Sequence, residues 1–162
     1  MEFRNATLQQ RLGKLLTPVH LFRLRLMRGM TVGVRVAAFD DQGRVFLVKH
    51  TYTPGWYLPG GAVDPGETAE EAAHREAREE GNLQCEVPLE LRGLYQNREV
   101  SYRDHVAFYV ARHSVQTAPR APDREIAASG FFAIDALPED VTKATMRRLD
   151  ELAGRRQPDG TW

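Results

Sequence analysis

One segment, Gly60–Leu83, constrains the chain more than any other, because a glycine-rich loop in it leads directly into an acidic stretch. The stretch Thr68–Glu80 is rich in strong helix formers and contains no Gly or Pro. It opens with Thr68-x-x-Glu71, the pattern of a capping box, and Gly81-Asn82 follows as a stop signal. The pattern therefore predicts a helix over residues 68–80.

Three carboxylates recur on this predicted helix with a spacing that points to metal binding. Glu76, Glu79 and Glu80 stand at i, i+3 and i+4, so they share one helix face. Oxygen-only clusters of this kind suit hard cations such as Mg²⁺ or Mn²⁺. The alternative is a solvated face stabilised by pairs such as Glu71–Arg75.

Two penalties favour the metal interpretation over the solvated face. Glu76 and Glu80 form a like-charge i,i+4 pair, which destabilises a helix by roughly 0.2–0.5 kcal/mol. Glu80 also lies near the predicted C-terminus of the helix, where the macrodipole disfavours a carboxylate. A bound divalent cation would reverse the sign of both effects.

Strand-like stretches on both sides of the acidic helix indicate the fold class. Thr31–Phe39 alternates apolar and polar residues, and with Val45–Lys49 across an Asp40–Gly43 turn it predicts a hairpin. Further elements are a short strand at Trp56–Leu58, strands near residues 90–96, 105–111 and 130–134, and a second helix between Pro138 and Gly154. This order predicts an α/β (α+β) fold, an α/β/α sandwich whose helices cover a mixed β-sheet.

Size and composition exclude several classes of protein. A chain of 162 residues fits one domain, and 42% hydrophobic residues are enough for a core. No stretch approaches the roughly 20 apolar residues of a membrane span, so no membrane association is expected. The 22 basic and 22 acidic residues cancel, so binding of nucleic acid by net charge is not indicated. The single cysteine, Cys85, fits a reducing, cytoplasmic location.

The balanced charge hides a basic N-terminal stretch. Residues 1–30 carry six Lys or Arg against one Glu, whereas the remainder carries 16 basic against 21 acidic residues. Leucines at helical spacing, including Leu8, Leu12 and Leu15, predict an amphipathic arm docked on the domain. A homodimer contact or an anionic partner are the alternatives, and the broken apolar run argues against a signal peptide. The expected organisation is an arm at 1–30, a domain at 31–154 and a C-terminal tail at 155–162.

The segment Gly60–Leu83 resembles the Nudix box, the signature of the Nudix hydrolases (MutT-related enzymes). Asn82 stands where the pattern has its final glycine, with Gly81 just before it, and Asn is the next-best residue for a left-handed helix cap. The surroundings, from Trp56–Gly60 to Phe131-Phe132 and Leu137-Pro138, extend the resemblance over about residues 31–154. The box positions that match are Gly61, Glu67, Arg75, Glu76, Ala77, Glu79, Glu80 and Leu83.

The resemblance implies a set of roles for the box residues. Glu76, Glu79 and Glu80 are expected to hold catalytic divalent cations, with the backbone carbonyl of Gly61. Arg75 is expected to orient a neighbouring carboxylate, and Glu67 to have a structural or outer-shell role. A further carboxylate from a late loop is common in the family, and Glu125, six residues before Phe131, is its best match. A surface glutamate is the alternative interpretation of that residue.

The resemblance also implies a reaction, the Mg²⁺-dependent cleavage of a pyrophosphate in a nucleoside diphosphate joined to another group. A metal-activated water would attack, with Glu76 or Glu79 as general base. Two alternatives are a Nudix-like module that binds a nucleotide without hydrolysing it, and a structural α/β domain whose acidic helix is incidental. The group attached to the nucleoside diphosphate stays open.

Three residues outside the box are candidates for contact with a nucleotide-type substrate. Tyr52 and Trp56 offer aromatic faces on which a base can stack, although Trp56 equally suits core packing. Arg35 is a candidate for substrate phosphates, with a solvated charge as the alternative. The histidines His50 and His74 are interpreted as ordinary surface residues.

Overall fold

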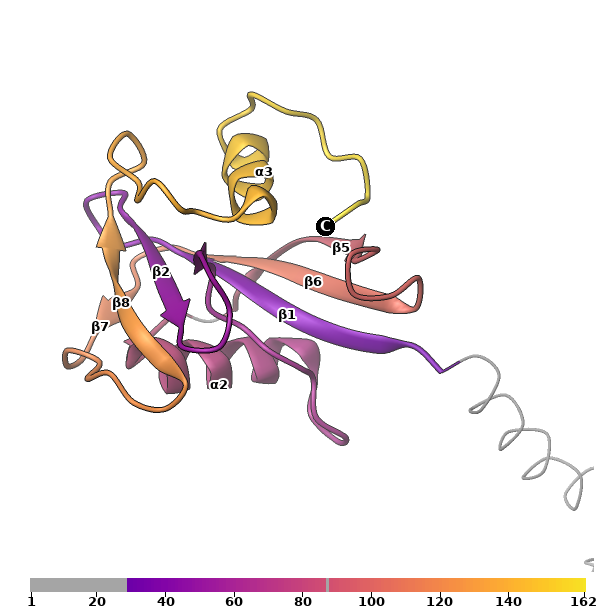
Figure 1. Ribbon diagram of the computed structural model, residues 1–162, viewed down its shortest axis with the longest axis horizontal. Helices are drawn as coiled ribbons and strands as arrows, with labels where there is room; N and C mark the ends of the chain where they lie inside the picture. The colour runs from indigo at the N-terminus through magenta and orange to yellow at the C-terminus, as the bar shows by residue number, and fades with distance from the viewer. Residues whose placement is uncertain (1–28, 87) are drawn as a thin grey trace, which may run out of the picture. The chain divides into compact units, whose positions relative to one another are not determined.

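A computed structural model describes residues 29–86 and 88–162 (Figure 1). The predicted N-terminal arm therefore lies almost entirely outside the described residues. The chain divides into two units, 1–30 and 31–162. In the part of the chain that the structure describes, no helix combines the length and apolar character that crossing a membrane requires.

The first sheet places β1 (Thr31–Ala38) at one edge, next to β6 (Asp104–Ala111). These two strands are parallel, with Val36 opposite Tyr109. On its other side β6 pairs antiparallel with β5 (Glu90–Gln96). The sheet is therefore mixed, as the sequence predicts.

The second sheet has β2 (Val45–His50) at its centre. It pairs antiparallel with β3 (Trp56–Tyr57) on one side and with β8 (Ile126–Phe132) on the other. A small antiparallel pair is formed by β4 (Leu83–Gln84) and β7 (Val115–Gln116). The three short sheets together form the middle layer of the domain.

Two helices, α2 (Ala69–Gly81) and α3 (Lys143–Leu152), cover opposite faces of this middle layer (Figure 1). Successive side chains of β1 point to opposite faces of the sheet. Val36 therefore belongs to the core on the α2 side, and Ala37 belongs to the core on the α3 side. Phe46 and Leu47 do the same from β2. Fully burying a side chain of this size stabilises a fold by about 1.5–3 kcal/mol. The predicted α/β/α sandwich is confirmed.

The predicted hairpin between the first two strands is wrong. β1 and β2 lie in different sheets and share only an isolated bridge between Phe39 and Val45. The edge of β1 that a hairpin would use is occupied by the glycine-rich loop. The N–H of Val34 donates to the carbonyl of Gly61 at 2.8 Å, and that of Val36 donates to Pro59 at 2.9 Å.

The ends of α2 follow the sequence closely. Thr68 is the N-cap, and both hydrogen bonds of the capping box with Glu71 are present. Asn82 is the C-cap, with a left-handed φ of 51°. The expected Glu71–Arg75 pair does not form, because the Glu71 carboxylate accepts from the Thr68 N–H at 2.7 Å. The second helix begins after its N-cap Thr142 rather than at Pro138.

The segment 155–162, expected as a tail, returns to the first sheet. The N–H of Trp162 donates to the carbonyl of Gln96 at 2.9 Å. Its ring packs edge-on against Tyr95 and Phe108. The guanidinium of the fully buried Arg148 lies 3.7 Å from the centroid of the Tyr95 ring. Trp162 thus contributes to the core on the α3 side.

Candidate active site

Two adjacent glycines bring the backbone of the loop against the carboxylates of α2. The N–H of Gly60 donates to Oε2 of Glu80 at 2.8 Å. Gly60 has a φ of +148°, and a Cβ there would stand 2.0 Å from the carbonyl oxygen of Val34. A Cβ at Gly61 would stand 2.4 Å from Oε1 of Glu76. The backbone therefore requires glycine at position 60, whereas at position 61 glycine leaves room for the Glu76 carboxylate.

Arg75 connects the loop to the first of the three carboxylates. Its Nη1 donates to Oε1 of Glu76 at 2.7 Å and to Oε2 of Glu79 at 3.2 Å. Its Nη2 donates to Glu67 at 2.8 Å and to the carbonyl of Ala62 at 3.0 Å. The hydrogen bonds from Arg75 lower the pKa of Glu67. Arg75 thus holds Glu76 in a fixed orientation and ties α2 to the loop.

The three glutamates differ in burial. Glu80 is only 5% exposed, and burial raises its pKa to about 7. Burial also raises the pKa of Glu76, against the lowering effect of Arg75. The side chain of Glu79 is 61% exposed at the rim. The charge of the partly buried Glu76 also raises the pKa of Glu80, so a cation between these carboxylates would be stabilising.

His50 joins this cluster, so its interpretation as an ordinary surface histidine is wrong. It is the last residue of β2 and is only 6% exposed. Its Nε2 lies 3.5 Å from Oε1 of Glu80. Burial, followed by the charge of Arg35, lowers its pKa. Period-2 alternation was the available signal, because Phe46, Val48 and His50 fall on one face of the strand.

Strand pairing brings Glu125 to the same place. His50 is the register partner of Ile126, and the N–H of Thr51 donates to the Glu125 carbonyl at 2.9 Å. One ligand atom from each of His50, Glu80 and Glu125 lies within 4.8 Å of the others. The structure therefore places Glu125 beside Glu80, although 45 positions separate them in the chain.

The loop that carries Glu125 is attached to the end of α2. Nε of Arg120 donates to the carbonyl of Glu79 at 2.9 Å, and Arg120 also pairs with Asp123. The carboxylate of Asp123 accepts the N–H groups of Glu125 and Ile126, each at 2.8 Å. These backbone hydrogen bonds, with Arg120, lower the pKa of Asp123 to about 2. Both anchors fix the backbone next to the carboxylate cluster.

The predicted substrate residues separate into two places. Arg35 donates from Nη1 to the carbonyl of Leu58 at 2.8 Å, and its charge acts on Glu80 and His50. Tyr52 is 70% exposed, and its ring centroid lies 5.1 Å from that of His50. Trp56 instead packs on Phe132 at 4.9 Å, in the core on the α3 side. Arg35 and Tyr52 thus lie beside the carboxylates, and Trp56 does not.

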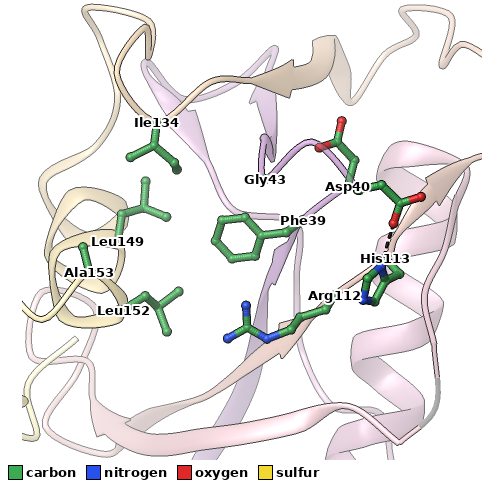
Figure 2. A pocket seen from close by; sticks show the side chains of 10 residues that line it. Phe39, Asp40, Gly43, Arg112, His113, Ile134, Leu149, Leu152 and Ala153 are labelled. Atoms are coloured by element: carbon green, nitrogen blue, oxygen red, sulfur yellow. Dashed lines mark hydrogen bonds and ion pairs between the residues drawn. The ribbon is translucent and has the colours of Figure 1, made fainter.

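A separate cavity of about 420 Å³ lies against α3 (Figure 2). Phe39, Ile134 and Leu149 form much of its apolar wall, and Figure 2 shows Arg112 and His113 at its side. None of the predicted catalytic, metal or substrate residues lines it. The chemistry-bearing groups therefore lie at the loop and at α2, away from this cavity.

Comparison with known proteins identifies the family to which this sandwich, with its glycine loop set against a carboxylate helix, belongs. The NUDIX domain family matches residues 29–152, so the chain belongs to that family. A crystal structure of a MutT NUDIX hydrolase from Burkholderia pseudomallei is similar, with a TM-score of 0.64 and 31% identity. That alignment covers 75% of this chain and 97% of the other.

Curated relatives are similar over parts of their length. A "Putative 8-oxo-dGTP diphosphatase" of Bacillus subtilis (strain 168) is 40% identical over 78 residues, which cover 48% of this chain and 52% of that protein. The mouse "8-oxo-dGDP phosphatase NUDT18" is 29% identical over 138 residues, which cover 83% of this chain and 42% of that protein. The chain thus spans about half the length of these relatives.

Proposed function

We propose that this chain is a divalent-metal-dependent pyrophosphohydrolase that cleaves a nucleoside diphosphate linked to another group. The observation that carries the proposal is the convergence on Glu80. The loop N–H of Gly60, the helix neighbour Glu76 and the distant Glu125 all meet this buried carboxylate. A fold without a cation to bind has little reason to bury an acid among other acids.

The residues present fit Mg²⁺ or Mn²⁺. Carboxylate and carbonyl oxygens are the donors that both ions prefer. The ion would be held by Glu76, Glu80 and Glu125, with Glu79 at the exposed rim. The carbonyl of Gly61 accepts one hydrogen bond from Val34 and keeps a second lone pair. When bound, such an ion neutralises phosphate oxygens and lowers the pKa of a water ligand.

The remaining side chains have roles that follow from their positions. Arg75 fixes the Glu76 carboxylate through Nη1, which presets it as a general base. Glu79 is the second candidate for the base, because its exposed carboxylate can reach solvent. Arg35 is suited to a substrate phosphate, and the exposed ring of Tyr52 to a base. Trp56 is supported less, since its ring packs in the core.

An oxidised purine nucleotide is the first substrate class to test. The Bacillus subtilis and mouse relatives are named for 8-oxo-dGTP and 8-oxo-dGDP, and the alignment to the mouse protein covers 83% of this chain. We place the activity in the cytoplasm, in keeping with the single, unpaired Cys85. A non-hydrolytic sensor is the alternative, but such modules usually lose box carboxylates, and this box retains all three.

A substrate panel tests the proposal directly. The full chain is incubated with Mg²⁺ and, separately, with 8-oxo-dGTP, ADP-ribose, a dinucleoside polyphosphate, a nucleotide sugar and capped RNA. Release of phosphate, pyrophosphate or nucleotide is scored beside Glu80→Gln as a matched control. Turnover that needs the metal and disappears in Glu80→Gln supports the proposal. Tight nucleotide binding without turnover of any substrate favours the sensor.

A further inference from the structure

The feature that the proposed chemistry leaves unused is His50. Its side chain is buried, and its ring centroid lies 5.1 Å from that of Tyr52 and 5.5 Å from that of Tyr57. Within the described residues, its Nδ1 has no hydrogen-bond partner. An unsatisfied buried ring nitrogen costs about 1–3 kcal/mol, so hydrogen bonding at Nδ1 does not account for the burial of this imidazole.

The other nitrogen points at the cluster. Nε2 stands 3.5 Å from Oε1 of Glu80. Two ligands that are each about 2.1 Å from one ion stand about 3.0 to 4.2 Å apart, for bond angles from 90° to 180°. The observed separation falls inside that range. The Glu125 carboxylate completes a triangle of ligand atoms, all within 4.8 Å of one another.

We infer that His50 supplies a nitrogen ligand to the cation at Glu80 and Glu125. The inference rests on the proposed function for the presence of the ion, and it changes the expected identity of that ion. An oxygen-only site suits Mg²⁺ or Mn²⁺, whereas imidazole suits transition ions such as Zn²⁺, Fe²⁺ and Ni²⁺. The site is therefore a mixed nitrogen and oxygen site that prefers a transition ion over Mg²⁺.

The fold supports this role from both flanking elements. His50 ends β2 on the face that carries Phe46 and Val48, so the buried strand fixes the backbone of the residue that carries the imidazole. The pairing of His50 with Ile126 fixes Glu125 beside it. Glu80 is held from the opposite side by the Gly60 N–H at 2.8 Å. Three separate elements thus present one ligand each.

Pulsed electron spin resonance of bound Mn²⁺ tests the inference, because it detects a coordinated nitrogen directly. The full chain is loaded with Mn²⁺, and free Mn²⁺ is counted to give the affinity. We expect a nitrogen coupling in the wild-type spectrum that vanishes in His50→Gln and persists in His105→Gln, a control histidine in β6. The Mn²⁺ affinity should fall about tenfold or more in His50→Gln, at least the loss that removal of an outer-shell partner causes.

A second measurement avoids dependence on the variant. Wild-type protein carrying ¹⁵N-labelled histidine should show a ¹⁵N coupling in place of the ¹⁴N coupling. This result identifies a histidine ligand even if His50→Gln does not fold. Bound Mn²⁺ without nitrogen coupling, in a protein that still hydrolyses its substrate, overturns the inference alone. Coupling unchanged in a folded His50→Gln also overturns it. Absence of Mn²⁺ binding overturns both the inference and the proposed function.

Discussion

The backbone N–H of Gly60 donates to Oε2 of Glu80 across 2.8 Å, which joins the loop ahead of α2 to the last turn of that helix. The carboxylate is therefore held at one oxygen, and its other oxygen faces His50. A substitution in the loop therefore acts on Oε2 of Glu80, whereas a substitution of Glu80 itself changes both oxygens.

Glu80→Gln should abolish tight binding of divalent cations with little effect on folding. The glutamine side-chain oxygen can still accept from the Gly60 N–H, but the negative charge that attracts a hard cation is gone. Calorimetric titration with Mn²⁺ measures the loss, and circular dichroism checks the fold. Unchanged Mn²⁺ affinity in a folded variant would falsify the assignment of the site.

Glu76→Gln should reduce turnover by on the order of 100-fold or more, as expected for a general base or metal ligand. Its carboxylate contacts both Arg75 and the loop at Gly61, whereas Glu79 is exposed. Steady-state kinetics on the best substrate of the panel measure the change. The exposed Glu139→Gln serves as a control and should keep full activity. Wild-type turnover in Glu76→Gln would remove that residue from the mechanism.

Gly61→Ala and Gly60→Ala should fail in different ways. The new Cβ at residue 61 meets the mobile end of the Glu76 side chain at 2.4 Å, so the carboxylate moves and metal affinity falls while the fold persists. At residue 60 the Cβ meets the backbone of Val34 at 2.0 Å and the φ is +148°, so the fold itself loses about 1–3 kcal/mol or more. Metal titration together with thermal denaturation separates the two outcomes. Equal loss of melting temperature in both variants would contradict this account.

Thr68→Ala should destabilise the domain by about 1 kcal/mol, because the Thr68 hydroxyl accepts the hydrogen bond from the Glu71 N–H in the capping box. For a domain of this size the melting temperature should fall by roughly 2–4 °C. Thr68→Ser keeps the hydroxyl and should restore most of the loss. A melting temperature of Thr68→Ala within error of the wild type would show that the cap contributes little.

The loop that carries Glu125 should resist acid. Since the pKa of Asp123 in the folded state is lowered to about 2, its hydrogen bonds stabilise the loop above the ordinary carboxyl pKa of 3.8. That contribution is lost as the pH falls from near 4 through about 2. Carbon-detected NMR titration of the Asp123 carboxyl measures the pKa. A value near 3.8 in the folded protein would contradict the hydrogen-bonded loop.

Local signals predicted the helix and its ends well. The capping box of Thr68 and Glu71 and the left-handed Asn82 depend on residues a few positions apart, so the sequence carries them directly. Strand pairing is different, because it is decided by elements far apart in the chain. The loop at Pro59–Gly61 competes with β2 for the edge of β1 and occupies it, which no local pattern reveals.

The same distinction explains the candidate site. The spacing of Glu76, Glu79 and Glu80 predicts one helix face, and the glutamates do share α2. It does not predict that Glu79 is exposed while Glu80 is buried. Alternation along β2 indicates that His50 is buried, but its contact with Glu80, 30 positions away, arises only from the packing of β2 against α2.

The pairing of the loop with β1 gives the domain an internal reporter of local opening. The amide protons of Val34 and Val36 lie in the middle of a buried strand, yet their acceptors are the carbonyls of Gly61 and Pro59 rather than another strand. Amides at such positions usually exchange with solvent only when the whole domain unfolds. Here they become exchangeable whenever the loop lifts away from β1. Deuterium uptake at these two valines therefore measures how often the loop at residues 59–61 separates from the strand beside the carboxylate cluster.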